Sequence, residues 1–411
     1  MRAVVEVTAE VGRAGSSLRG VAADEATVYA ALSEVPAARR TMIEARQGDT
    51  VAWRSVITGS GGPIVRTTSL VVVALAADEP TVRGTPGAIV SGLDPSAGTI
   101  RWTVPFGATG WTIITALAAT ADDGAIVVGS FSGTLKVGAH VVGSGGDSDG
   151  FVAALGAGGD VRWLVRLGGP GPDAVQGVAT RGSRIAIAGT FTAGADLQGE
   201  GLPAWDERLP FSDVFVAELD ATGGRVWSST FGGKDEDSAM GVAIDSKGRV
   251  AVAAAARGSV RIAGLEHVPA GSADGLVAWF GADGTSGPVQ LIGGTDADGL
   301  RAIAAVGDVV VVGGYYAGSM VVGDSKLEAG GGDGAFLAAL DPQGALAVWD
   351  LGGAGREEVA ALAAIPGTAG FIAGVAHTAE LGVGSITLPA PADPLAGAAI
   401  VIRAAPATRE P

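Results

Sequence analysis

The chain contains no cysteine, only four lysines among its 411 residues, and no long apolar segment. Without cysteine it has no disulfide, no thiolate nucleophile and no cysteine-ligated zinc. Few lysines and a net charge of −16 disfavour binding to nucleic acid or to anionic lipid surfaces. The longest apolar run, residues 70–77, is far shorter than the ~20 residues of a membrane span. We therefore expect no nucleic-acid partner and no membrane insertion.

Glycine, in contrast, is abundant, with 68 residues, and 47% of the chain is hydrophobic. This apolar content is too high for a disordered chain. Many glycines together with only 17% charged residues are typical of a β-rich protein with tight turns. The acidic surface itself suits solubility, cations or basic partners.

A short sequence motif that ends in glycine recurs along the chain. Its first glycine lies at Gly107, Gly168, Gly232, Gly293 and Gly352, at spacings of 61, 64, 61 and 59 residues. Each interval holds four short strand signals bounded by Gly, Asp or Pro, such as residues 240–245, 249–254, 275–280 and 288–292. One four-stranded antiparallel sheet per repeat is the pattern of a propeller blade.

Counting these units predicts an all-β fold, a seven-bladed β-propeller of four-stranded antiparallel blades that forms one domain over residues 1–406. The remainder of the chain after Gly352 supplies only three strands, and residues 2–12 read as the missing fourth. The N-terminal strand would thus complete the last blade and leave no open sheet edge. The expected blades are 18–59, 60–107, 108–168, 169–232, 233–293, 294–352, and 353–406 with 1–12; residues 407–411 form a tail.

Several segments of the repeat resemble the SBBP-type β-propeller repeat of secreted and envelope proteins in myxobacteria and related bacteria. The resemblance rests on residues 129–133, 149–155, 163–169 and 241–250, and it is weak over residues 1–107. It implies a propeller without a shared catalytic motif. It also implies an extracellular, periplasmic or cell-envelope location, although residues 1–12 lack the apolar core of a signal peptide, so a leader would have been removed. The alternative location is the cytoplasm.

Two acidic residues recur in each of the later repeats, on what would be one face of the propeller. One set lies five residues after each first glycine, and the other lies just before each third strand; they are Asp173, Asp237, Asp298 and Glu357, and Asp149, Asp213, Asp274 and Asp333. These acids could bind a ligand or Ca²⁺ at the loops of this face, because Ca²⁺ takes oxygen ligands. The alternative is that each carboxylate caps backbone amides of its own turn. No other cofactor is indicated.

The loops between second and third strands are long in five blades, and most contain small hairpin signals. They could carry binding, since loops on a rigid scaffold often do, or they could shield blade edges. In the most individual loop, residues 202–211, Trp205 and Phe211 are the candidate contact residues. Tryptophans that recur in the fourth strands, among them Trp53, Trp102 and Trp163, are expected to pack between blades.

Three functions remain open. The first is a non-catalytic binding or scaffold propeller that engages a protein or glycan through its hairpin-bearing face. The second is a polysaccharide hydrolase or lyase with carboxylates at the channel mouth, which requires a convergent pair of acids. The third is a structural subunit of a larger extracellular assembly.

Overall fold

The computed structural model describes residues 5–11, 16–34, 40–48, 50–82, 85–206, 211–378, 380–383, 386–388 and 398–404. These residues form β-strands joined by turns, and the strands pair antiparallel within several sheets. The chain is therefore all-β, as its sequence predicts. Within these ranges there is no helix of the length and hydropathy needed to cross a membrane. The expected tail, residues 407–411, lies outside the described residues.

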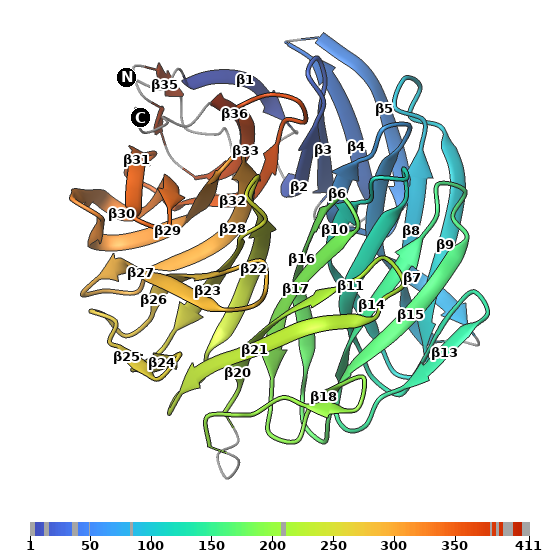
Figure 1. Cartoon of the computed structure of the whole chain (residues 1–411). Coiled ribbons are helices and arrows are strands. Elements are labelled where there is room, and N and C mark those ends of the chain that lie inside the picture. The colour runs from blue at the N-terminus through green and yellow to red at the C-terminus, as the bar shows by residue number, and fades with distance from the viewer. Residues whose placement is uncertain are drawn as a thin grey trace.

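The strands pair in groups of four that follow the chain around a central axis (Figure 1). The first two groups contain β2 (Ser16–Ala23), β3 (Val28–Glu34), β4 (Arg40–Gln47) and β5 (Thr50–Thr58), then β6 (Ser60–Arg66), β7 (Val71–Val82), β8 (Thr85–Leu93) and β9 (Ile100–Ala108). The next two contain β10 (Thr112–Ala119), β11 (Ala125–Phe131), β14 (Asp149–Leu155) and β15 (Val161–Gly168), then β16 (Ala174–Arg181), β17 (Arg184–Phe191), β20 (Asp213–Leu219) and β21 (Arg225–Gly233).

Two further groups follow, and the terminal strands pair with each other. These two groups contain β22 (Ser238–Ile244), β23 (Val250–Ala256), β26 (Asp274–Phe280) and β27 (Ser286–Gly294), then β28 (Gly299–Val306), β29 (Val309–Val322), β30 (Ser325–Asp341) and β31 (Gly344–Asp350). The last sheet contains β32 (Glu357–Ala364), β33 (Phe371–His377), β36 (Ala398–Ala404) and β1 (Val5–Val11). In this sheet β1 pairs with β36 in a register that runs from Val5 opposite Ala404 to Val11 opposite Ala399.

Short hairpins extend the outer strand of the preceding group. They are β12 (Thr134–Val137) with β13 (His140–Gly143), β18 (Asp196–Leu197) with β19 (Glu200–Gly201), and β24 (Val260–Ile262) with β25 (Leu265–His267). Each pairs across a group boundary, β12 with β9, β18 with β15 and β24 with β21. The far end of β29, which forms a hairpin with the start of β30, pairs with β27 in the same way. We call these four elements the edge hairpins. A further hairpin, β34 (Leu381–Val383) with β35 (Ile386–Leu388), follows the same plan through a single bridge between Leu381 and Gly353.

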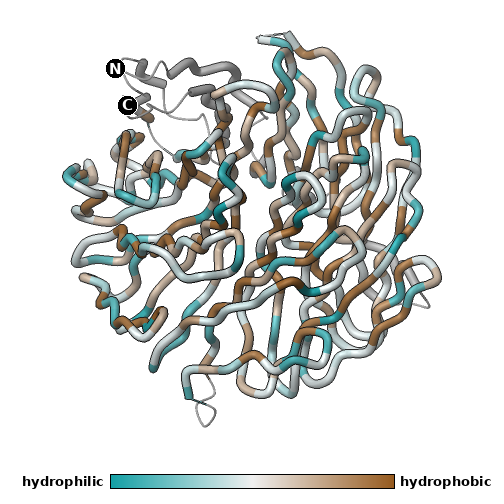
Figure 2. The backbone as a smooth tube through the Cα atoms, in the orientation of Figure 1, coloured by the Kyte–Doolittle hydropathy of each residue, from teal (hydrophilic) through white to brown (hydrophobic). Residues whose placement is uncertain are grey.

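The hydrophobic core lies between neighbouring groups. Strands β11, β14, β20 and β26 are buried at every position, so both of their faces are covered. In Figure 2, hydrophobic residues (brown) accordingly recur along the strands. Trp227 and Phe231 on β21, for example, stack on Phe280 of the next group, with ring centroids 6.2 and 6.4 Å apart.

Fourth-strand tryptophans also join neighbouring groups, as expected from the sequence. The indole N–H of Trp102 donates to the carbonyl of Ala157, 2.8 Å away in a turn of the next group. Trp53 and Trp163 make equivalent bonds of 2.7 and 3.0 Å to Pro95 and Ala221. The recurring indole is thus a structural contact between repeats.

Candidate functional site

The eight recurring acids lie in four pairs at the junctions between groups. In three pairs the first acid begins the third strand of one group, whereas Asp333 lies within β30. The second acid precedes or begins the innermost strand of the next group. The pairs are Asp149 with Asp173, Asp213 with Asp237, Asp274 with Asp298, and Asp333 with Glu357. A backbone hydrogen bond joins the two sides, as where the amide of Asp173 donates to the carbonyl of Ser148 at 2.8 Å.

The second acid of each pair accepts hydrogen bonds from backbone amides. Asp173 receives the amides of Gly169 at 2.6 Å and Thr192 at 2.7 Å, and so holds its own turn against the end of the second strand. Asp298 does the same with Gly294 and Ala317 at 2.5 and 3.0 Å, and Asp237 accepts from Arg257, after the second strand, at 3.1 Å. Glu357 accepts from Gly353 and Gly355 of its own turn, at 3.1 Å each.

In three of the four pairs the first acid caps the loop that leads into its strand. Asp274 receives the amides of Ala270 and Gly271 at 2.6 and 3.2 Å. Asp149 receives the amide of Gly145 at 2.8 Å and also the guanidinium of Arg166. Asp213 receives the amide of Trp205 at 2.5 Å, whereas Asp333 is partly exposed and lies 3.6 Å from the guanidinium of Arg356.

Burial perturbs the titration of these acids. It raises the pKa of Asp173 to about 6 and that of Asp237 to about 7, against the opposing effect of the amides they accept. Burial also raises the pKa values of Asp274, Asp298 and Glu357. The partner acid adds a smaller increase, as Asp213 does for Asp237.

The contacts favour the turn-capping interpretation over a cation site. Ca²⁺ needs six to eight oxygen ligands, whereas seven of these eight carboxylates already accept hydrogen bonds from backbone amides. Throughout the described ranges, no cluster of three or more Asp, Glu or His residues is arranged to hold a metal ion. The pairs are also separated from one another, one at each junction, so they do not converge on a shared pocket.

Trp205 and Phe211 flank a segment, residues 207–210, that lies outside the described residues. Trp205 is half-buried and is fixed by the bond from its amide to Asp213. Phe211 is 39% exposed. Of the two candidate contact residues, Phe211 therefore presents more of its side chain to solvent.

The edge hairpins lie along the periphery of the molecule in Figure 1. The sequence suggests hairpins that rise from one face, but backbone pairing instead lays them on the outer strands of their neighbours. This arrangement favours the edge-shielding alternative for their backbone. Their side chains still reach solvent, since Val141, Leu265 and Val321 are 57%, 66% and 47% exposed. Val268, just after β25, is also 66% exposed.

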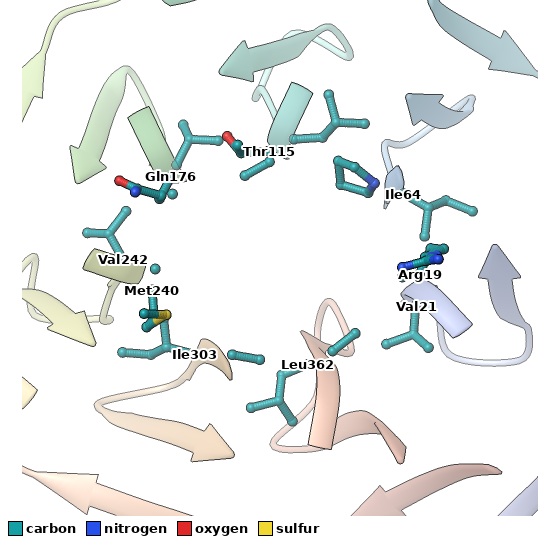
Figure 3. A pocket seen from close by; sticks show the side chains of 18 residues that line it. Arg19, Val21, Ile64, Thr115, Gln176, Met240, Val242, Ile303 and Leu362 are labelled. Carbon is teal, nitrogen blue, oxygen red and sulfur yellow. The ribbon is translucent and has the colours of Figure 1, made fainter. Parts of the chain in front are cut away.

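A cavity of about 210 Å³ lies on the central axis and is lined by the innermost strands (Figure 3). Each of these strands carries a β-bulge with one extra residue at the same point. After the bulge comes a small residue and then an aliphatic one. The small residues are Gly20, Pro63, Ala116, Gly177, Gly241, Ala302 and Ala361; the aliphatic residues, which we call the aliphatic level, are Val21, Ile64, Leu117, Val178, Val242, Ile303 and Leu362.

The bulge itself brings four larger side chains to the cavity. They are Arg19, Thr115, Gln176 and Met240, and we call them the bulge level. Sequence reasoning missed this site. A signal was present, because the triplet of variable, small and aliphatic residue recurs in each repeat, as in residues 115–117, 176–178 and 240–242.

Comparisons with known proteins show structural similarity to β-propeller proteins. No protein-family model matches the chain, and a search of curated proteins finds no relative. Among solved structures, BamB from Moraxella catarrhalis is 13% identical, with a TM-score of 0.45 over 94% of this chain and 85% of its own. A europium-containing methanol dehydrogenase is 12% identical, with a TM-score of 0.46 over 97% and 93% of the two chains.

A third similar structure is the β-propeller domain of the Trilobed protease from Pyrococcus furiosus. It is 9% identical, with a TM-score of 0.47 over 92% of this chain and 97% of that domain. Two of the three are named as a dehydrogenase and as a domain of a protease, and at these identities none of the three bears on the activity of this chain.

Proposed function

We propose that the protein is a non-catalytic binding or scaffold propeller with seven blades, closed by its N-terminal strand. The proposal of seven blades is supported by the seven innermost strands that contribute residues to the central cavity. The pairing of β1 with β36 supports closure. Membership of the SBBP-type family, and with it a place in the cell envelope or outside the cell, remains a proposal that follows from the repeat phrases alone.

The alternative of a polysaccharide hydrolase or lyase is less well supported. Such chemistry needs two carboxyl groups that converge on one substrate bond. The residues that line the cavity include no Asp or Glu, and the recurring acids are distributed over four junctions, one pair to each. Their raised pKa values have a structural cause, which is burial at the junctions between groups, rather than a catalytic arrangement.

The observation that carries a binding function is where the exposed apolar side chains lie. Half of the ten large hydrophobic residues that are exposed in the described chain fall on the edge hairpins or their loops: Val141, Phe211, Leu265, Val268 and Val321. Four of these five are aliphatic, whereas sugar rings stack on aromatic faces. Apolar side chains held by paired backbone fit a protein partner better than a glycan.

The test replaces Leu265 and Val268 together by serine. Both are 66% exposed, so we expect the fold to be unaffected. The matched control is Val226→Ser, which removes an equally apolar side chain, 57% exposed, from β21 outside the hairpins. Wild-type and variant proteins are immobilised, and retained proteins are quantified by mass spectrometry and then purified for measurement of Kd.

The proposal predicts one protein that binds the wild type and the Val226→Ser control and that binds the double variant at least about tenfold more weakly. Retention that is unchanged by the double substitution contradicts a hairpin interface. Binding of a glycan array that is insensitive to these substitutions supports the glycan alternative. Discrete oligomers of the purified chain in sedimentation velocity support the assembly alternative.

A further inference from the structure

Two neighbouring junctions are each crossed by an arginine that reaches from one group to the next. Arg184, at the start of β17, donates to the backbone carbonyls of Gly248 at 2.8 Å and Ala282 at 3.3 Å, in two turns of the following group. Arg249, just before β23, donates to the carbonyl of Asp308 at 2.9 Å in the group after that. The guanidinium suits this role because its planar set of donors can reach several carbonyls at once.

The preceding junction, between the group of β10 and the group of β16, has a glycine in place of this arginine. Gly124 directly precedes the first residue of β11 that pairs with β14, just as Arg184 directly precedes the first residue of β17 that pairs with β20. The neighbouring strand differs as well. Glu218 on β20, whose carboxylate accepts the Nε–H of Arg184 at 2.7 Å, corresponds to Ala154 on β14.

A cavity of about 240 Å³, which we call the junction cavity, lies at this place. The turns that line it, at Ser183 and at Ala221, correspond to the two turns whose carbonyls hold Arg184 in the next junction. Its inner part is formed by three buried apolar residues, Ile126, Ala154 and Ile185. The junction cavity is therefore the space that an arginine occupies in the following junction.

The two turns at the rim of the junction cavity are open to solvent, since Ser183 and Ala221 are both exposed. Among the described residues, nothing donates a hydrogen bond to the carbonyl of Ser183. The carbonyl of Ala221 accepts one bond, from the indole of Trp163 at 3.0 Å, and a carbonyl oxygen has two lone pairs. Both carbonyls can thus accept from a bound donor.

The charge at the rim favours a cation. Arg162, which also lines the junction cavity, is paired with the carboxylate of Asp122 and lies 3.9 Å from that of Asp160. Two carboxylates thus surround one guanidinium, in a chain of net charge −16. The side chain of Asp122 is 55% exposed, so it remains accessible to a second cation.

We propose that the junction cavity binds a short alkylguanidinium, which is the chemistry of an arginine side chain. The guanidinium donates to the carbonyls of Ser183 and Ala221, as Arg184 does to their counterparts. Its alkyl chain lies against the apolar inner part, and Asp122 balances its charge. A free alkylguanidine and an arginine residue of a peptide share this chemistry.

The inference is independent of the proposed protein interface, because the residues that line the junction cavity lie outside the edge hairpins. Failure of one proposal therefore leaves the other standing.

The experiment titrates the full chain at pH 8 with n-butylguanidinium by isothermal calorimetry, with n-butylammonium and n-butylurea as comparison probes. We expect saturable binding of butylguanidinium with one site per chain, weaker binding of butylammonium, and the weakest binding of butylurea, which has a similar shape and no charge. L-Arginine and the blocked peptide acetyl-Gly-Arg-Gly-amide separate the two sources. Tighter binding of the amino acid indicates a free ligand, and tighter binding of the peptide indicates an arginine residue.

Two substitutions at Ala154 change the junction cavity in opposite directions. Ala154→Leu should weaken butylguanidinium about tenfold or more, because the larger side chain fills the inner part of the cavity. Ala154→Glu should strengthen it about tenfold, because it supplies the carboxylate that Glu218 provides to Arg184. The matched control is Ala354→Leu, which adds the same hydrocarbon at an exposed turn between β31 and β32 and should leave binding unchanged.

Circular dichroism establishes which variants are folded. The proposal is overturned if butylguanidinium fails to saturate the wild type at millimolar concentrations, or if butylurea binds as tightly. It is equally overturned if folded Ala154→Leu binds as tightly as the Ala354→Leu control. Should Ala154→Leu not fold, Ala154→Glu decides, and affinity no higher than that of the wild type overturns the proposal.

Discussion

Replacing Asp237 by asparagine should stabilise the protein at neutral and alkaline pH and leave it nearly unchanged at acidic pH. The side chain is 1% exposed and accepts a hydrogen bond from the amide of Arg257 at 3.1 Å. Burial, with help from the charges of Asp213 and Asp235, raises its pKa to about 7. Asparagine has nearly the same shape and keeps an acceptor oxygen, but it carries no charge into the interior.

The sign and size of the effect follow from linkage. Because the pKa of Asp237 in the folded protein lies above its ordinary value of 3.8, the folded state binds the proton more tightly than the unfolded state does. The contribution of Asp237 to stability is therefore fully present below about pH 4 and is lost as the pH rises through about 7, above which the loss levels off. At about 1.36 kcal/mol for each pH unit between the two pKa values, the full loss is of the order of 4 kcal/mol. The asparagine variant does not lose this free energy, because its side chain does not ionise.

The assay is urea denaturation at pH 5, 6, 7 and 8, followed by tryptophan fluorescence. The quantity compared is the difference in unfolding free energy between variant and wild type at each pH, which cancels the titration of other groups. The control is Asp324→Asn, which makes the same charge change at an exposed turn. The reasoning is refuted if the difference for Asp237→Asn stays constant between pH 5 and pH 8, or if the control shows the same rise.

Two further predictions concern packing. Gly177→Ala should lower the free energy of unfolding by about 1–3 kcal/mol in the same assay, because the new Cβ would lie 2.7 Å from the Cα of Gly241 on the neighbouring innermost strand. Gly143→Ala, in open space, should change it by less than about 0.5 kcal/mol, and equal effects would contradict this account. Trp102→Phe should cost about 1 kcal/mol by removing the bond to the carbonyl of Ala157, and an unchanged denaturation midpoint would show that the bond is unimportant.

The repeat made much of the fold predictable. The strand expected at residues 240–245 is β22, Ser238–Ile244, and the strand expected at residues 2–12 is β1, which pairs with β36. The acids could be recognised as turn residues because each repeat has the same turn to build. These predictions succeed because they depend on short-range patterns that recur.

The remaining features depend on contacts between distant segments. Nothing in residues 134–137 indicates that β12 will pair with residues 106–108 of the preceding group rather than project from a face. Similarly, the sequence pattern gives Arg19 and Arg301 the same position in their repeats. Arg301 has partners because Glu358 lies on the next innermost strand and Tyr315 on the strand paired with its own, a difference that appears only after folding.

The division between repeated and unrepeated residues also indicates where binding can evolve in such a chain. The small residues and the aliphatic level recur in all the innermost strands, and the carboxylate pairs recur at four junctions, so each of these residues is constrained by the neighbouring group that it contacts. The bulge level is under no such constraint, since Arg19, Thr115, Gln176 and Met240 differ in charge and shape while their bulges coincide. A bulge releases its extra residue from the pairing rules of the strand, so its side chain is free to contact a ligand instead.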